Sequence, residues 1–129
     1  INKIYNKQYI NNTETNVEGF SKNLNYSMNS FEYDLRSEEK LLLLIDYLKN
    51  LDIKVTLILS PYHPDLYQMM KSNKSIFIDV ENKFREISQH HNIEIIGSYD
   101  GSVVGCDRKD FYDGMHPKDK CMSKLFNNF

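Results

Sequence analysis

The sequence lacks the features that mark several special classes of protein. Its longest uninterrupted apolar run is Leu41–Ile45, far short of the roughly 20 residues that a membrane-spanning helix needs. Sixteen Lys and Arg against eighteen Asp and Glu give a net charge of −2, so there is no excess of basic residues for a phosphate backbone or an anionic membrane. We therefore expect no nucleic-acid partner and no membrane span in this chain.

Cysteine is also scarce. Cys106 and Cys121 are the only two, and they have neither CxxC nor zinc-finger spacing. We expect two unpaired thiols, although a bridge between them stays open and would need an oxidising compartment. The chain begins at Ile1 instead of Met, so it is expected to be a processed product or part of a longer protein, and the sequence leaves its localisation open.

The length of 129 residues suits one globular domain. Residues 1–36 are polar and rich in Asn, with scattered aromatics. Because disordered tails are usually poor in aromatic residues, we expect an irregular or partly helical lead-in that docks in part on the body. The body is expected to be an α/β unit over residues 37–129.

Hydrophobic periodicity then predicts an alternation of helices and strands. Helical spacing indicates a helix from Ser37, as the N-cap, to about Leu51. A β-branched, apolar segment predicts a strand over Ile53–Ser60 that is buried on both faces. The following elements are a short helix after Pro64, a longer helix from Ile76 to about His91, a second strand over Ile93–Ile96 closed by Gly97, and a last helix over residues 118–127 with Pro117 at its first position.

This order is typical of crossover units on a parallel sheet, so the predicted class is α/β with three layers. Two strands alone make a poor core. We therefore expect that the chain is the C-terminal portion of a larger domain, and that an open sheet edge is covered by residues 1–36 or by a second copy in a homodimer.

Ligands of open parallel sheets lie beyond the carboxyl ends of the strands. Two segments emerge there: Ser60–Pro64 after the first strand and Ser98–His116 after the second. Within the first, Tyr62 and His63 lie in a stretch stiffened by two prolines and are candidates for contact with substrate. If the strands are neighbours, both segments share one rim.

The second segment ends in Asp113-Gly114-Met115-His116-Pro117. Asp113 and His116 lie three residues apart on a turn relaxed by Gly114, a spacing that can place a carboxylate against an imidazole nitrogen. Such a pair fixes the histidine tautomer and stabilises the imidazolium that forms when the other nitrogen takes a proton from a nucleophile. The same residues can also form a purely structural turn.

This stretch resembles the last block of the SGNH (GDSL-like) hydrolase and acyltransferase family, an Asp-x-x-His just before a C-terminal helix. Val55–Ser60 and Ile93–Gly97 look like the last two core strands of the flavodoxin-like sheet of that family. The resemblance covers roughly residues 38–127. It implies ester hydrolysis or acyl transfer, with a serine nucleophile, His116 as general base, Asp113 as its orienting group, and no cofactor.

The chain departs from the family pattern in one important respect. The nucleophile of the family lies in a Gly-Asp-Ser type block after a first strand, and its oxyanion donors are a Gly and an Asn. Ser21, Ser27, Ser30 and Ser37 follow no apolar strand, and no Gly-x-Asn-Asp occurs. We therefore expect the serine to lie outside this chain and the chain alone to be inactive.

The resemblance thus implies that the chain is part of a serine esterase or O-acyltransferase that acts on acyl esters, such as those of cell-surface glycans. The alternative is a noncatalytic α/β binding or interaction module in which the same loop only shapes a turn. A divalent-metal site made of His63, Asp113 and His116 is a further arrangement that the residue types permit, but we expect no metal.

Overall fold

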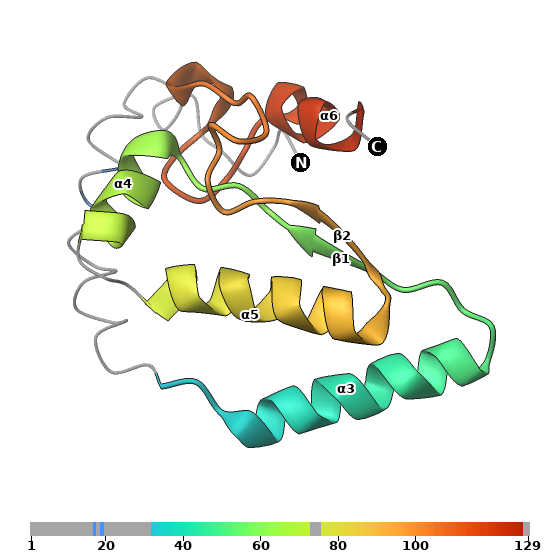
Figure 1. The fold of residues 1–129 in the computed structure, drawn as a ribbon. Coiled ribbons are helices and arrows are strands. Elements are labelled where there is room, and N and C mark those ends of the chain that lie inside the picture. The colour runs from blue at the N-terminus through green and yellow to red at the C-terminus, as the bar shows by residue number, and fades with distance from the viewer. Residues whose placement is uncertain (1–16, 18, 20–31, 73–75, 128–129) are drawn as a thin grey trace.

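The computed structural model describes residues 17, 19, 32–72 and 76–127 of the chain. Helices and strands alternate along it (Figure 1). The elements are α3 (Leu35–Asn50), β1 (Thr56–Leu59), α4 (Pro64–Ser72), α5 (Ile76–His91), β2 (Glu94–Gly97), the short 3-10 helix η1 (Arg108–Asp110) and α6 (Asp119–Asn127). Their order is the predicted one.

The helix α3 begins three residues earlier than predicted, because its N-cap is Asp34 and not Ser37. The carboxylate of Asp34 accepts a hydrogen bond from the backbone N–H of Arg36 at 3.1 Å. The expected cap, Ser37, instead donates its hydroxyl to Asp34 at 2.8 Å. An acidic N-cap serves the free N–H groups of the first turn as well as a serine does.

Both long helices end through a residue in the left-handed region. Asp52, with φ 57°, follows α3, and Asn92, with φ 49°, follows α5. Asp and Asn tolerate this conformation better than other side chains do. In each case the chain reverses at this residue and leads into a strand.

The two strands form a parallel pair in which Ile58 lies beside Ile96 and Leu59 beside Gly97. The first strand is shorter than predicted, and the second lies one residue later than predicted, at Glu94–Gly97. The expected burial of the first strand on both faces is wrong, because Ile58 is 51% exposed. Among the residues that the structure describes, β2 is the only strand beside β1, and coverage of the other edge by a second copy stays a prediction.

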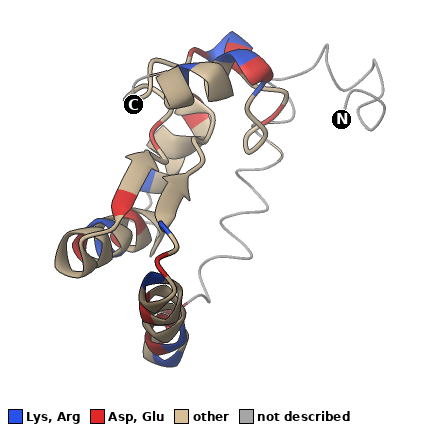
Figure 2. Cartoon of the chain, turned by 90° about the vertical axis from the view of Figure 1, so that its right-hand side faces the viewer, with Lys and Arg blue, Asp and Glu red and all other residues tan. Residues whose placement is uncertain are grey.

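Helices lie on both sides of the strands. In Figure 1, α5 lies below the pair with α3 beneath it, and α6 lies above. Charged residues are spread over α3 and α5, whereas the strands carry only Glu94 (Figure 2). The core between α3, α5 and the strands consists of Ile45, Ile87 and Ile93, with Leu41, Leu42, Val55, Leu57 and Phe84 packed against them.

Part of α3 has an apolar surface that faces away from this core. Ile45 is 1% exposed, whereas Leu43, Leu44 and Tyr47 are more than half exposed. The apolar residues of α3 between Leu41 and Leu48 therefore belong to the core only on the side that faces α5.

A second apolar cluster joins α4 to the lead-in. Val17, which lies before the continuously described part of the chain, is buried against Leu66 and Met70 of α4. The residues around it lie outside the described part, so the predicted character of residues 1–36 stays a prediction. Within the described residues, none of the helices has the length and apolarity needed to cross a membrane.

The class is α/β, with a small parallel sheet of two strands. A flavodoxin-like sheet of three layers needs more strands than these residues supply, and it stays a prediction. What the fold does establish is that the carboxyl ends of β1 and β2 are neighbours, so the segments that follow them begin side by side.

Candidate active site

The two segments after the strands continue together beyond the sheet. The backbone N–H of Tyr62 donates to the carbonyl oxygen of Tyr99 at 3.0 Å, and Tyr62 and Asp100 form a parallel bridge. A side chain at Gly101 would press on the Tyr62 carbonyl, since its Cβ would lie 2.7 Å from that oxygen. The shared rim predicted from the strand order is therefore present.

The helix α5 holds the start of the second segment. The carboxylate of Glu81, which is almost buried, accepts hydrogen bonds from the Ser98 hydroxyl at 2.8 Å and from the Tyr99 N–H at 2.9 Å. Arg85 pairs with the same carboxylate at 2.6 Å and donates to the Gly97 carbonyl. The sequence analysis missed Glu81, although an acidic residue at a core-facing position of α5, four residues after Phe77, is a usable signal.

Asp113 and His116 form the predicted pair. Both carboxylate oxygens of Asp113 approach Nδ1 of His116, at 2.9 Å and 2.8 Å. The Asp113 side chain is 3% exposed, whereas that of His116 is 54% exposed. A buried carboxylate thus holds one ring nitrogen, and the ring itself reaches the surface.

The backbone of the turn holds the carboxylate in place. Oδ1 of Asp113 accepts hydrogen bonds from the N–H of Met115 at 2.8 Å and from that of His116 at 2.9 Å. Such local bonds are a common property of aspartate in turns. Because three donors converge on one carboxylate, the orientation of Asp113 is fixed before any ligand binds.

The turn is the tip of a short hairpin. The N–H of Tyr112 donates to the carbonyl of His116 at 2.9 Å, and the N–H of Lys118 donates to the carbonyl of Asp110 at 2.8 Å. Between these bonds, Phe111 and Pro117 form an antiparallel bridge. Pro117 therefore belongs to the hairpin, and the prediction that it opens the last helix is wrong, since α6 begins at Asp119.

His63 lies beneath this tip. Its ring is buried, with 3% of the residue exposed, and packs edge to face on Phe111 with the centroids 5.4 Å apart. Nδ1 accepts a hydrogen bond from the N–H of Asp65 at 3.2 Å, which places the proton of the neutral ring on Nε2. Burial lowers the pKa of His63, so the neutral form is favoured.

Tyr62 is partly buried among other aromatic side chains. Its ring lies 5.3 Å from that of Tyr99 and 5.9 Å from that of Phe77. Burial, together with the nearby Tyr99, raises the pKa of the Tyr62 hydroxyl to about 12. Tyr62 and His63 both lie in the segment that forms the rim, which is the position predicted for them. Their contact with a substrate stays a proposal.

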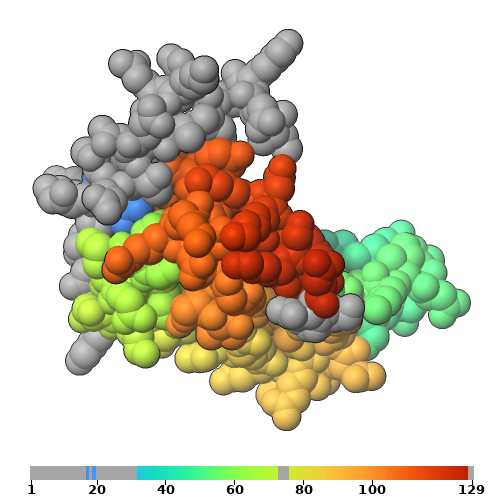
Figure 3. Space-filling model, turned by 90° about the horizontal axis from the view of Figure 1, so that it is seen from above, coloured from blue at the N-terminus to red at the C-terminus, as the bar shows by residue number. Residues whose placement is uncertain are grey.

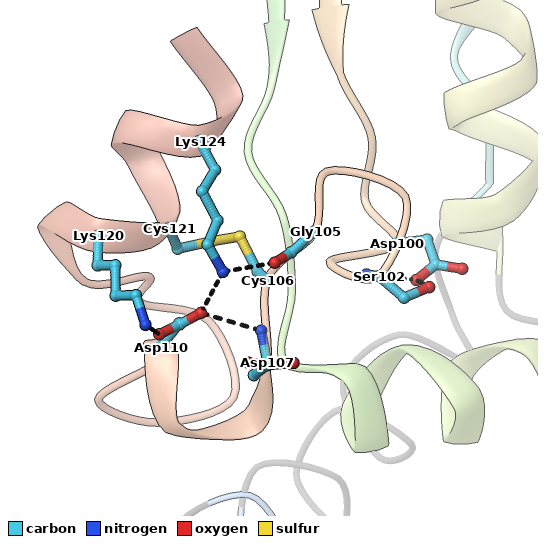
Figure 4. The surroundings of a disulfide bond; sticks show 9 residues. All are labelled: Asp100, Ser102, Gly105, Cys106, Asp107, Asp110, Lys120, Cys121 and Lys124. Carbon is cyan, nitrogen blue, oxygen red and sulfur yellow. Dashed lines mark hydrogen bonds and ion pairs between the residues drawn. A yellow bond between two sulfur atoms is a disulfide. The ribbon is translucent and has the colours of Figure 1, made fainter. Parts of the chain in front are cut away.

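Two features of the second segment differ from expectation. Cys106 and Cys121 form a disulfide, with their Cα atoms 5.3 Å apart (Figure 4), so the preference for unpaired thiols is wrong. Asp110 lies in a polar stretch of this segment, where charged side chains are usually exposed, yet it is 1% exposed. Its burial depends on lysines from α6, which the sequence does not place beside it.

The described residues around Asp113 and His116 do not form a metal site. No group of three His, Cys, Asp or Glu side chains in the described part of the chain is arranged to hold a metal ion. Ser21, Ser27 and Ser30 lie outside the described residues. Ser37 is in the first turn of α3, bonded to Asp34.

Comparison with known proteins identifies the family. A family model described as DltD protein matches residues 1–120. The chain belongs to the DltD family. This is a family of D-alanine transfer proteins related to the GDSL/SGNH group, and it is involved in the D-alanylation of teichoic acids.

Neither a curated protein nor a solved structure matches the chain significantly. Membership of the DltD family agrees with the acyl-transfer chemistry implied by the Asp113 and His116 block, and it supports the SGNH resemblance in its general form.

Proposed function

We propose that this chain carries the base and its orienting carboxylate for a serine O-acyltransferase or esterase of the DltD family, with the nucleophilic serine supplied from outside the chain. The observation that supports the proposal best is the contact of both Asp113 oxygens with Nδ1 of His116, at 2.9 Å and 2.8 Å. Because Nδ1 is committed to Asp113, Nε2 is the nitrogen that exchanges a proton with the reacting groups.

The proposed reaction has two steps. As the serine oxygen attacks the acyl carbonyl, Nε2 of His116 takes the hydroxyl proton, and it then gives that proton to the departing alcohol when the ester C–O bond breaks. In the second step the hydroxyl of an acceptor, or water, attacks the acyl-enzyme by the reverse proton route. Asp113 stays ionised and stabilises the imidazolium in both steps.

Family membership suggests the substrate class. D-alanylation of teichoic acids joins an acyl group to hydroxyls of a cell-surface polymer, so the acyl esters proposed here are D-alanyl esters of such a polymer. Tyr62 and His63 are proposed to contribute to the substrate side of the rim. For His63 this contribution is indirect, because its ring is buried under the hairpin tip.

The test uses the intact protein that contains these residues. Wild type, His116→Ala and Asp113→Asn are assayed with p-nitrophenyl acetate and with a fluorophosphonate probe that labels activated serines. We expect His116→Ala to lower the rate by about 10³-fold or more and to abolish labelling, and Asp113→Asn to lower the rate by roughly 10²- to 10⁴-fold. His90→Ala, at an exposed position near the end of α5, is the matched control.

The outcome that contradicts the proposal is full ester hydrolysis and labelling in His116→Ala. That result would show that His116 is not the base, and it would favour a noncatalytic role for this chain, in which Asp113 serves only the turn. A loss of activity in the control variant as well would show that the change in rate reflects folding instead of chemistry.

A further inference from the structure

The hairpin that carries Asp113 and His116 is tied to α6 through a buried charge. Asp110 lies at the base of the hairpin, and its side chain is 2% exposed. Oδ2 of Asp110 accepts hydrogen bonds from the ammonium of Lys124 at 2.8 Å and from the N–H of Asp107 at 3.0 Å. The ammonium of Lys120 lies 3.5 Å from Oδ1 (Figure 4).

A carboxylate this deeply buried is stable only because it is paired. The hydrogen bond from Lys124 contributes most to holding the pKa of Asp110 down at about 2, so the group is ionised in the neutral range. Lys124 also donates to the carbonyl of Gly105 at 2.5 Å. One lysine of α6 therefore holds both the side chain at the base of the hairpin and the backbone that leads into it.

The geometry of the site depends on where this base is held. The carbonyl of Asp110 accepts the N–H of Lys118, and the carbonyl of His116 accepts the N–H of Tyr112. The outgoing strand of the hairpin runs directly into α6, which begins at Asp119. The contact between Asp110 and Lys124 holds the incoming strand of the hairpin to the same helix. Both strands are therefore attached to α6, and the His116 turn is at the opposite end of the hairpin.

The same two segments are joined a second time by covalent and apolar contacts. The Cys106–Cys121 disulfide links the start of the hairpin region to α6. Phe111, which has no exposed surface, packs with Val104 and both cysteines. Figure 3 shows α6 and the segment after β2 gathered on one face of the molecule. The buried charge is therefore part of a rigid support below the tip.

We infer that Asp110, through its ion pair with Lys124, is a positioning residue for the Asp113 and His116 pair. It does not touch substrate. Its effect is to keep the two hairpin strands in the register that brings the Asp113 carboxylate against Nδ1 of His116. The inference rests on the proposed function in that His116 is the base whose position matters.

The test measures which ring nitrogen of neutral His116 carries the proton in the 129-residue chain. The ¹⁵N shifts of the imidazole ring, measured above the ordinary titration range of histidine, give the shares of the Nδ1–H and Nε2–H forms. We expect the Nδ1–H form to dominate in wild type. In Asp110→Asn the share of the Nε2–H form should rise several-fold, because the Asp113 carboxylate would no longer be held within hydrogen-bond distance of Nδ1 of His116.

Matched variants separate position from general stability. Asp119→Asn removes the same charge at an exposed position of α6 and should leave the tautomer unchanged. If Asp110→Asn does not fold, Lys124→Gln is used in its place. It removes the main partner of the Asp110 carboxylate by changing a side chain that is itself partly exposed. Lys124→Arg should restore the wild-type tautomer, since it keeps a charged donor.

The failures of the two proposals are distinguishable. Asp113→Asn should change the tautomer whatever Asp110 does, so an unchanged tautomer in that variant would contradict the Asp113 and His116 pair and with it the proposed function. A change in Asp113→Asn, combined with wild-type tautomer shares in Asp110→Asn and Lys124→Gln, would overturn the positioning role alone.

Discussion

The backbone N–H of His63 donates a hydrogen bond to the carbonyl oxygen of Gly114 at 2.9 Å. This bond joins the segment after β1 to the tip of the hairpin that carries Asp113 and His116. His63 and Gly114 are 51 residues apart in sequence, yet they meet because parallel neighbouring strands end at the same edge. His63 thus links the position of the proposed base to the end of β1.

Replacing His63 tests how much this link contributes to stability. His63→Ala leaves a cavity against Phe111 and removes the acceptor of the Asp65 N–H. We expect the free energy of unfolding to fall by about 2–3 kcal/mol, measured by urea unfolding followed by circular dichroism. His90→Ala, the same change at an exposed position, should stay within about 0.5 kcal/mol of wild type. Equal effects of the two changes would contradict a packed role for His63.

The neutral state of His63 predicts a pH dependence. Burial lowers the pKa of His63 below the 6.5 that is ordinary for histidine. Between the folded and the unfolded pKa, the unfolded chain therefore binds a proton that the folded chain does not. Stability therefore falls as the pH drops through this range, by up to about 1.4 kcal/mol per pH unit. The measurement is urea unfolding at pH 7.5 and at pH 5.5.

The control for this pH effect is His63→Asn, whose side-chain oxygen can still accept the Asp65 N–H but does not titrate in this range. The remaining histidines are common to both proteins, so the difference between the two pH profiles isolates His63. Parallel profiles of wild type and His63→Asn would show that His63 does not titrate differently on folding.

Short-range patterns predicted much of this structure. The helices α4 and α5 follow from apolar spacing, and the Asp113 and His116 contact follows from a separation of three residues on a turn with Gly114. In these cases the interacting residues are neighbours in sequence, so the local backbone conformation alone brings them together. The rim required only one further assumption, that the two strands are adjacent.

The features that sequence reasoning missed depend on residues brought together by tertiary packing. Asp110 is buried only because Lys124 reaches it from α6, and nothing in the sequence near Asp110 signals this. The exposure of Ile58 depends on which elements cover β1, and a β-branched apolar run looks the same whether or not a neighbour is present. Pro117 lies in a hairpin because Phe111 pairs with it.

The Cys106–Cys121 disulfide should contribute strongly to stability. The cysteines are 15 residues apart, and closing a loop of this size stabilises a protein by about 3 kcal/mol. We expect the Cys106→Ala/Cys121→Ala double variant, and wild type treated with dithiothreitol, to lose a similar free energy of unfolding. The double variant should not respond to dithiothreitol.

A thiol titration gives the outcome that would contradict the disulfide. Wild-type protein unfolded in urea without reductant should show no reactive thiols with Ellman's reagent, whereas the same sample after reduction and removal of the reductant should show both. Two reactive thiols before reduction would mean that the pair is open in the purified protein.

The last prediction concerns the end of β2. Gly97 has φ 84°, and a Cβ there would collide with the Leu59 carbonyl and lie 2.9 Å from Cδ1 of Leu125. Gly105 has φ 76° but open space around its Cβ position. Both Gly→Ala changes therefore carry the backbone penalty of about 1–2 kcal/mol, and only Gly97→Ala adds a steric cost. We expect Gly97→Ala to lose about 3 kcal/mol or more in urea unfolding. Equal losses would contradict the close packing of β1, β2 and α6 at this position.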